Sequence, residues 1–291
     1  MNADLLLDAR AELGEGPAWD ESGHRLYWVD ILPGRVHVFH VDSGQDECFD
    51  LGETVGCLAP RQSGGLVLAL RFGFATLSLP GGILTRLAAP EADSPHNRFN
   101  DGKCDPAGRF LAGSMNLNKI QQPTGALYSL APNGQVKRLR EGVTISNGLT
   151  WSPDYKTLYY IDTPTRQVLA YDYDLESGNI ANPQPIIKVP PEMGLPDGMT
   201  SDMEGNLWIA LWDGAAIAVW EPARGRLIRT IPIPAQRPTA CVFGGEKMNV
   251  LYITSARNGL SQRKLSQYPF SGGLFAVQTE TQGLPTFRFA G

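Results

Sequence analysis

Histidine and paired cysteine are scarce in this 291-residue chain, and their scarcity limits the metal chemistry that it can support. It contains four histidines, three of which (His24, His37 and His40) lie close together near the N-terminus, so a histidine cage for zinc is not expected. The four cysteines include no Cys-x-x-Cys pair. We therefore expect buried free thiols rather than a zinc site or a disulfide framework.

Long hydrophobic runs and clusters of basic residues are also missing. No apolar stretch approaches the roughly 20 residues of a membrane helix, and residues 1–14 lack the apolar centre of a signal peptide. The formal net charge is −5 without a lysine or arginine run, whereas binding to phosphate backbones needs a basic surface. These absences predict a cytoplasmic protein that binds neither membranes nor nucleic acid.

Six copies of a short apolar strand recur along the chain. Successive copies lie roughly 40 to 50 residues apart, which is the period of a four-stranded propeller blade, and they begin at Leu26, Leu66, Arg109, Leu158, Leu207 and Leu251. Turns rich in Asp, Ser and Gly precede most copies, and two further strands follow each of the first five. The pattern predicts an all-β, six-bladed β-propeller of four-stranded antiparallel blades, without long amphipathic helices.

The outer strands are the least distinct part of this pattern. The fourth strand of the fourth blade is expected at Ile186 to Val189. The sixth blade lacks an outer strand near the C-terminus, and residues Leu5 to Asp8 can supply it. Residues 1–291 would then form a single domain whose ring is closed by the two ends of the chain, leaving no open sheet edge.

One position of the repeat carries a set of oxygen-bearing side chains. It lies eight residues before the turn glycine or its equivalent, at the start of the innermost strand, and is occupied by Glu15, Gly56, Asn100, Asn147, Asp197 and Arg237. Any single Asx-Gly pair is most simply a turn former. Two carboxylates and two carboxamides converging on the channel axis instead predict a site for one divalent cation such as Ca²⁺, Mg²⁺ or Mn²⁺.

An arginine stands beside this position in the third blade. Arg98 precedes Asn100 by two residues, so its guanidinium can reach the same end of the channel and bind substrate oxygens or a developing anion. The alternatives are a solvated surface arginine or an ion pair with Asp101. Asp101 itself is expected to be a turn former rather than a ligand.

Several longer motifs resemble one known family. They are Leu13-Gly-Glu-Gly-Pro-Ala-Trp19, Asn97-Arg-Phe-Asn-Asp-Gly-Lys103, Ile145-Ser-Asn-Gly-Leu149 and Leu195-Pro-Asp-Gly-Met199. Together with weaker matches up to Gly291, they resemble the gluconolactonase, regucalcin and senescence-marker-protein family. The resemblance implies a six-bladed propeller that hydrolyses a small sugar lactone. It implies metal ligation by Glu15, Asn147 and Asp197, with calcium, zinc, manganese or iron as the metal, and substrate contacts from Arg98 and Asn100.

The chain departs from the family pattern after the run Ala112 to Met115. Familiar animal members carry glutamates there, whereas this chain has Asn116-Leu-Asn-Lys119. Asn118 or Lys119 is therefore the candidate to replace the acidic contact to substrate hydroxyls. For the chemistry, we expect Asp197 to serve as the general base and Arg98 to stabilise the oxyanion.

Two other functions remain open at this stage. A metal-dependent esterase or organophosphate hydrolase could use the same nucleophile, and a non-catalytic calcium-binding propeller could use the same ligands. The expected partner is a small-molecule sugar lactone, and the chain is expected to be a monomer or a weak homodimer.

Overall fold

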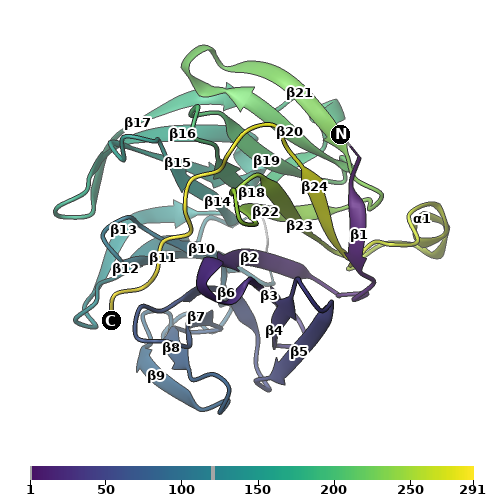
Figure 1. The fold of residues 1–291 in the computed structure, drawn as a ribbon. Helices are drawn as coiled ribbons and strands as arrows, with labels where there is room; N and C mark the ends of the chain where they lie inside the picture. Colours follow the sequence, from purple (N-terminus) through teal and green to yellow (C-terminus); the bar gives the residue numbers. More distant parts are fainter. Residues whose placement is uncertain (1, 119–121) are drawn as a thin grey trace.

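Six four-stranded antiparallel sheets surround a central channel in this computed structural model, which describes residues 2–118 and 122–291 (Figure 1). The prediction of a six-bladed β-propeller is confirmed. Within the described residues, no helix has both the length and the apolar character needed to cross a membrane.

The first three blades follow one another along the chain, each from its innermost to its outermost strand. The first blade contains β2 (Gly14–Asp20), β3 (Arg25–Asp30), β4 (Arg35–His40) and β5 (Gln45–Asp50). The second contains β6 (Val55–Pro60), β7 (Leu66–Leu70), β8 (Phe74–Leu77) and β9 (Leu84–Ala88). The third contains β10 (Asn97–Cys104), β11 (Phe110–Asn116), β12 (Gly125–Leu130) and β13 (Val136–Val143).

The other three blades complete the ring. The fourth contains β14 (Ser146–Trp151), β15 (Thr157–Asp162), β16 (Gln167–Asp174) and β17 (Asn179–Lys188). The fifth contains β18 (Leu195–Ser201), β19 (Leu207–Trp212), β20 (Ala216–Glu221) and β21 (Arg226–Pro232). The sixth contains β22 (Pro238–Gly244), β23 (Val250–Ser255), β24 (Leu274–Gln278) and, as its outer strand, β1 (Asp4–Leu7).

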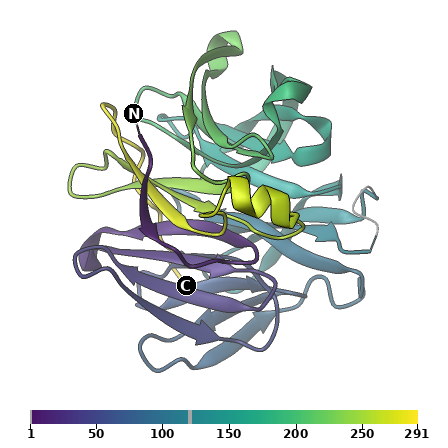
Figure 2. The same cartoon turned by 90° about the vertical axis from the view of Figure 1, so that its right-hand side faces the viewer.

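The first and the last strand of the chain meet in the sixth blade. Strand β1 pairs antiparallel with β24, with Leu5 opposite Phe275, and the two strands lie side by side in Figure 2. The N-terminal strand falls one residue earlier than expected but makes the expected pairing. It covers the edge of β24, which would otherwise expose unpaired backbone groups.

The hydrophobic core is divided among the interfaces between neighbouring blades. Phe74 of the second blade packs against Phe99 and Phe110 of the third, and Trp19 of the first stacks on Tyr252 of the sixth with ring centroids 5.3 Å apart. The innermost strands are buried along nearly their whole length, whereas most residues of β5, β9 and β21 are exposed or half-buried. Burial on both faces holds the start of each innermost strand rigid.

Three details differ from the sequence prediction. Strand β17 begins at Asn179, well before the expected Ile186. The sequence did not mark its first part, because that part is mostly exposed and Ile180 alone packs there against the core. A short helix, α1 (Gln262–Gln267), precedes β24. Three of the cysteines are buried thiols as expected, but Cys48 is exposed on the outer strand β5.

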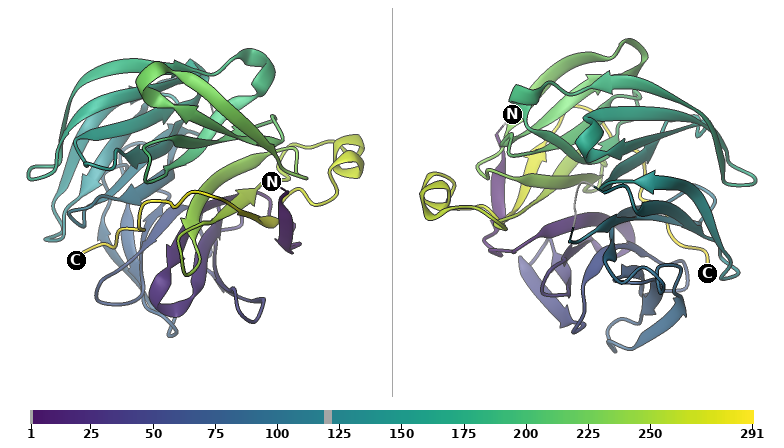
Figure 3. Two further views of the ribbon diagram at one scale, coloured as in Figure 1. Left: turned by 45° about the horizontal axis from the view of Figure 1, so that its top comes forward. Right: turned by 180° about the vertical axis from the view of Figure 1, so that it is seen from behind.

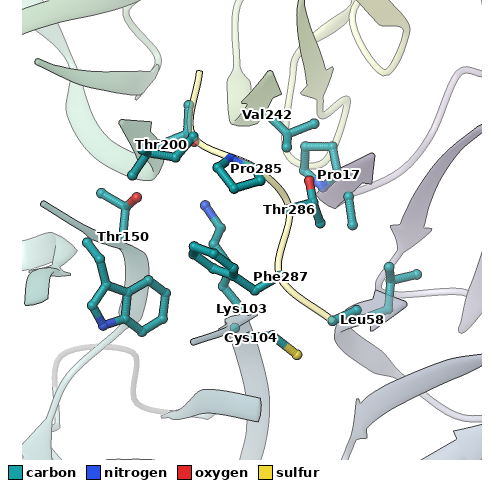
Figure 4. A pocket seen from close by; sticks show the side chains of 15 residues that line it. Pro17, Leu58, Lys103, Cys104, Thr150, Thr200, Val242, Pro285, Thr286 and Phe287 are labelled. Carbon is teal, nitrogen blue, oxygen red and sulfur yellow. The ribbon is translucent and has the colours of Figure 1, made fainter. Parts of the chain in front are cut away.

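The segment after β24 crosses one end of the channel, in front of the blades in Figure 1 and behind them in the reverse view of Figure 3. Its backbone N–H groups donate in turn to three blades: Leu284 to the Ser201 carbonyl, Phe289 to the Pro60 carbonyl, and Ala290 to the Gly108 carbonyl. Beneath it lies a small cavity of about 30 Å³ lined by Leu284 to Phe287 and by the later parts of the innermost strands (Figure 4). The opposite end, where the innermost strands begin, is open.

Candidate functional site

The repeat position singled out in the sequence lies at the open end of the channel, which we call the mouth. Glu15, Asn100, Asn147 and Asp197 lie near the start of β2, β10, β14 and β18, and all four are buried. A β-bulge falls at or directly after this position in each of the six innermost strand pairs. Such bulges re-aim side chains. They allow the side chain at this position to point toward the channel axis.

Glycine following the ligand candidates has two different roles. We expected it to permit a sharp turn, and Gly16 does adopt a positive φ of 53°. Gly148 and Gly198 do not. A Cβ at Gly148 would lie 2.6 Å from the Asp197 carbonyl oxygen, and one at Gly198 would lie 2.5 Å from Ala240 Cβ. These two glycines are needed because the neighbouring innermost strand approaches so closely.

The two non-ligand members of the repeat position are explained by their surroundings. A Cβ at Gly56 would lie 2.5 Å from the carbonyl carbon of Phe99, so the second blade has no room for a side chain there. Arg237, in the sixth blade, is drawn away by Asp213, whose Oδ1 accepts a 2.6 Å hydrogen bond from its Nε. Four blades therefore remain to supply oxygen ligands.

Five predicted site residues line one cavity at the mouth. Glu15, Arg98, Asn100, Asn147 and Asp197 come from four different blades and share a cavity of about 280 Å³. This volume is near the lower end of the roughly 300–1,000 Å³ typical of small-molecule sites. The cavity suits a compact ligand rather than a polymer.

Hydrogen bonds link the amide side chains of the cavity. Arg98 Nη1 donates to Asn100 Oδ1 at 2.7 Å, and Asn100 Nδ2 donates to Asn147 Oδ1 at 2.8 Å and to the Ser146 carbonyl at 2.7 Å. Asn147 Nδ2 in turn donates to Thr163 Oγ1 at 2.7 Å. This series of hydrogen bonds orients Asn147 with its side-chain carbonyl oxygen toward Asn100. That oxygen retains a second lone pair for a cation.

Arg98 is a buried cation rather than a surface arginine. It is 4% exposed, its Nη1 also donates to the Phe99 carbonyl at 2.8 Å, and it makes no salt bridge with Asp101 among the described residues. Its Nε is enclosed and has no hydrogen-bond partner in the described part of the chain. Burial lowers the pKa of Arg98 to about 10, opposed by the charges of Glu15 and Asp197. At neutral pH it thus places a positive charge beside two carboxylates.

The two carboxylates are poorly compensated by protein groups. Burial raises the pKa of Glu15 to about 8, with Asp101 adding to the shift. Burial, and then the charge of Glu15, raise the pKa of Asp197 well above its ordinary value. Within the described residues neither forms a salt bridge, and Glu15 Oε2 accepts a hydrogen bond only from the Gly16 N–H, at 3.0 Å.

This environment fits a divalent cation. Two buried carboxylates and the Asn147 carbonyl oxygen form an oxygen-only donor set, which hard cations such as Ca²⁺, Mg²⁺ and Mn²⁺ prefer. A positive charge between Glu15 and Asp197 favours their ionised forms and opposes the effect of burial. The lining of the cavity thus fits the predicted ligands, and metal binding by Glu15, Asn147 and Asp197 stays a prediction.

Asp101 and Lys103 lie deeper in the channel than the mouth. Asp101 is buried, so it is not a simple surface turn residue, and its Oδ1 accepts a 2.7 Å hydrogen bond from the Gly102 N–H. Lys103 donates from Nζ to the Met199 carbonyl at 2.9 Å and reaches the small far cavity in Figure 4. Attraction to Lys103 opposes the burial that raises the pKa of Asp101.

The predicted contact Asn118 does not join the other site residues. It is exposed, its Nδ2 lies 2.9 Å from His96 Nδ1, and its backbone N–H donates to Asn116 Oδ1. The residue from this strand that does line the cavity is Met115. The alternative contact, Lys119, lies outside the described residues.

Several residues at the mouth were missed in the sequence. Thr163 directly follows β15, Trp212 ends β19, and Asn258 lies in the loop after β23. The corresponding strands end on different kinds of residue, β3 on Asp30 and β23 on Ser255 where β19 ends on Trp212, so the repeat does not mark these positions. The rest of the wall is apolar and consists of Leu13, Met115, Ile145 and Leu195.

A buried carboxylate also supports the site from behind. Glu91, 2% exposed, accepts hydrogen bonds from the hydroxyls of Ser114 and Tyr128 and from Asn97 Nδ2 at 2.9 Å. Asn97 exchanges two further hydrogen bonds with Thr124, each 3.0 Å long. Glu91 thus fixes the start of β10 at Asn97 and, through Asn97, the segment at Thr124 that leads into β12. Because Asn97 directly precedes Arg98, these hydrogen bonds also help to position Arg98.

Glu91→Gln is therefore expected to lower the free energy of unfolding by about 2 kcal/mol, since it replaces charged hydrogen bonds with weaker ones and places an amide N–H₂ against donors. Urea denaturation measures this effect, with the exposed Glu141→Gln as the control. If Glu91→Gln has the same free energy of unfolding as the wild type, Glu91 does not have this supporting role.

Comparison with known proteins places the chain among relatives of full length. YvrE of Bacillus subtilis (strain 168), named for a sugar lactone lactonase activity, is 38% identical over 100% of this chain and 99% of its own. Regucalcin of Gallus gallus is 39% identical over 97% of this chain and 96% of its own. A crystal structure of regucalcin from Agrobacterium tumefaciens, described as a calcium-binding protein, superposes with a TM-score of 0.93 at 28% identity, covering 98% of this chain and 96% of that one.

The family described as the SMP-30/Gluconolactonase/LRE-like region matches residues 13–257. That span runs from just before Glu15 to just before Asn258 and includes the metal-ligand candidates and both substrate-contact candidates lining the cavity. The family match and the full-length relatives show that this chain belongs to the SMP-30/gluconolactonase/LRE-like family.

Proposed function

We propose that this chain is a metal-dependent hydrolase that opens a small sugar lactone, an aldonolactone, to the corresponding aldonic acid. The observation that carries the proposal is the convergence of Glu15, Asn147 and Asp197 with the buried Arg98 on one compact cavity. The name of the Bacillus relative supports the lactone as substrate, and the description of the Agrobacterium relative supports a divalent cation.

Glu15, Asn147 and Asp197 would hold the cation. When bound, a divalent cation polarises the lactone carbonyl and lowers the pKa of a water molecule. Calcium, manganese, zinc, magnesium and iron(II) are all candidates for this position.

Asp197 acts as the general base in the proposed reaction. It takes a proton from the water whose oxygen attacks the lactone carbonyl carbon, forming a tetrahedral oxyanion. The oxyanion collapses, the bond from the carbonyl carbon to the ring oxygen breaks, and that oxygen leaves as a hydroxyl after taking the proton back. Arg98 stabilises the oxyanion by its charge, and Asn100 Oδ1 can accept a hydrogen bond from a substrate hydroxyl.

The test is an acid-release assay on a panel of five- and six-membered aldonolactones and one phosphotriester. The protein is assayed as purified, after chelation, and after addition of each candidate metal. We expect hydrolysis of at least one lactone, a loss of roughly 10³-fold or more on chelation, and recovery with one or more metals.

Three results would argue against the proposal. A rate unchanged by chelation would remove the metal from the reaction. Hydrolysis of the phosphotriester alone would favour an organophosphate hydrolase. A metal-dependent rise in thermal stability without turnover of any substrate would favour a non-catalytic calcium-binding protein.

A further inference from the structure

The carboxamide and hydroxyl groups on one side of the cavity are almost fully occupied by one another. Both Nδ2 hydrogens of Asn100 are donated, to Ser146 and Asn147. Asn147 donates to Thr163, whose hydroxyl donates in turn to the Pro196 carbonyl at 2.8 Å. Apart from the Arg98 guanidinium, this side therefore offers few donors to the hydroxyl groups of a substrate.

The opposite side, between the fifth and sixth blades, has unused polar groups. Trp212 and Asn258 both line the cavity. The indole Nε1 of Trp212 makes no hydrogen bond to the described residues, nor does the carboxamide of Asn258. Both residues are half-buried and line the cavity, so a ligand at the mouth would contact them.

Trp212 is held in place by an ion pair behind it. The Arg237 guanidinium lies over the indole with its carbon 4.5 Å from the ring centroid. Arg237 is in turn bonded to the Asp213 carboxylate and to the Asn258 backbone carbonyl. The sixth blade thus uses its repeat position to fix both Trp212 and the loop that carries Asn258.

A ring that presents an apolar C–H face and projecting hydroxyls matches this surface. Aromatic faces are large, rigid and apolar, and the adjoining Leu13 and Leu195 extend the apolar wall. The Asn258 carboxamide both donates and accepts hydrogen bonds, as a hydroxyl group does. A flat lactone ring with at least one hydroxyl group is complementary to both features.

We propose that Trp212 and Asn258 form the subsite that selects the substrate, with the C–H face of the lactone ring on the indole and a ring hydroxyl bonded to the Asn258 carboxamide. This inference rests on the proposed lactonase function and deepens it. The preferred substrates are lactones that retain a hydroxyl on this side. The matching deoxy lactones are rejected because they leave Asn258 unpaired when the cavity is filled.

The test uses Asn258→Ala and Trp212→Ala, with Asn249→Ala and Trp220→Phe as matched controls. Asn249 lies beside β23 at its other end, and Trp220 is buried in β20 of the same blade as Trp212. Asn258→Ala should lower the preference for a hydroxylated lactone over its deoxy analogue by roughly 10-fold or more. Trp212→Ala should raise KM by roughly 10-fold or more, with a smaller change in kcat, because it removes binding area from both ground and transition states.

Binding without turnover gives a second readout. Titration with an aldonate, the expected product, should change the intrinsic tryptophan fluorescence of the wild type and of Trp220→Phe, but not of Trp212→Phe. If the wild type is active and both alanine variants keep its KM and its selectivity, the subsite is overturned and the lactonase proposal stays intact. Aldonate binding that depends on Trp212 in a protein inactive on all lactones would overturn the lactonase proposal and keep the subsite.

Discussion

Asp197→Asn should lower kcat for lactone hydrolysis by roughly 10³-fold, because a carboxamide cannot take the proton of the attacking water. It should also weaken metal binding, since one of the two ligand carboxylates is lost. Steady-state kinetics at saturating metal, together with the metal-induced rise in melting temperature, separate the two effects. A rate near that of the wild type would remove Asp197 from the role of base.

The same substitution should not destabilise the metal-free fold. Burial and the charge of Glu15 raise the pKa of Asp197, so its ionised form is a liability in the folded state. A neutral side chain of the same shape removes that liability. In chelator at pH 8, the free energy of unfolding of Asp197→Asn should equal or exceed that of the wild type.

Asp20→Asn provides the matched control. Asp20 is also buried, at the far end of β2, but it accepts hydrogen bonds from Ser22, Arg25, Tyr27 and Arg288, which hold its pKa below its usual range. Its replacement should cost about 2 kcal/mol of stability at neutral pH. Metal binding should survive, so the two aspartates are expected to behave in opposite ways.

The metal-free protein should lose stability as the pH rises from about 4.5 to about 8. Over this range the unfolded Glu15 carboxyl gives up its proton while the folded one, with its pKa raised to about 8, retains it. The folded state then binds more protons than the unfolded state, and the free energy of unfolding falls with pH. Asp197 contributes in the same direction. The loss is on the order of a few kcal/mol.

Urea denaturation in chelator across this pH range measures the effect. Glu15→Gln should flatten the slope relative to the wild type, whereas the nearby exposed Glu12→Gln should not. Saturating calcium should oppose the loss, because it binds the ionised carboxylates and stabilises the folded state by mass action. A wild-type slope retained in Glu15→Gln would show that other groups cause the pH dependence.

The repeat was visible in the sequence because the inner strands are buried on both faces. Strands such as β3 and β19 are continuous apolar runs, and their spacing alone predicted the blade count. The outer strands could not be delimited in this way. The first part of β17 is mostly exposed, and one core contact from Ile180 makes no hydrophobic period, so nothing in the sequence marks its beginning at Asn179.

The ligand candidates were predictable for a related reason. A repeat places equivalent residues at equivalent points around one axis, so a single column of the aligned copies was sufficient to bring Glu15, Asn147 and Asp197 together. Leu13, Ile145 and Leu195 of the cavity wall also share one column, two residues before the ligands. Trp212 and Asn258 belong to no column of like residues. Trp212 and Asn258 lie at blade ends, and the orientation of Arg237 depends on Asp213 across a blade interface.

The C-terminal segment that crosses the far end of the channel makes the tunnel blind. Its backbone is bonded to Ser201, Pro60 and Gly108, and only a cavity of about 30 Å³ remains beneath it. A lactone would therefore have to enter, and its acid leave, through the mouth of the channel. Accumulated acid should then compete with incoming lactone, so that progress curves slow well before the reaction reaches equilibrium.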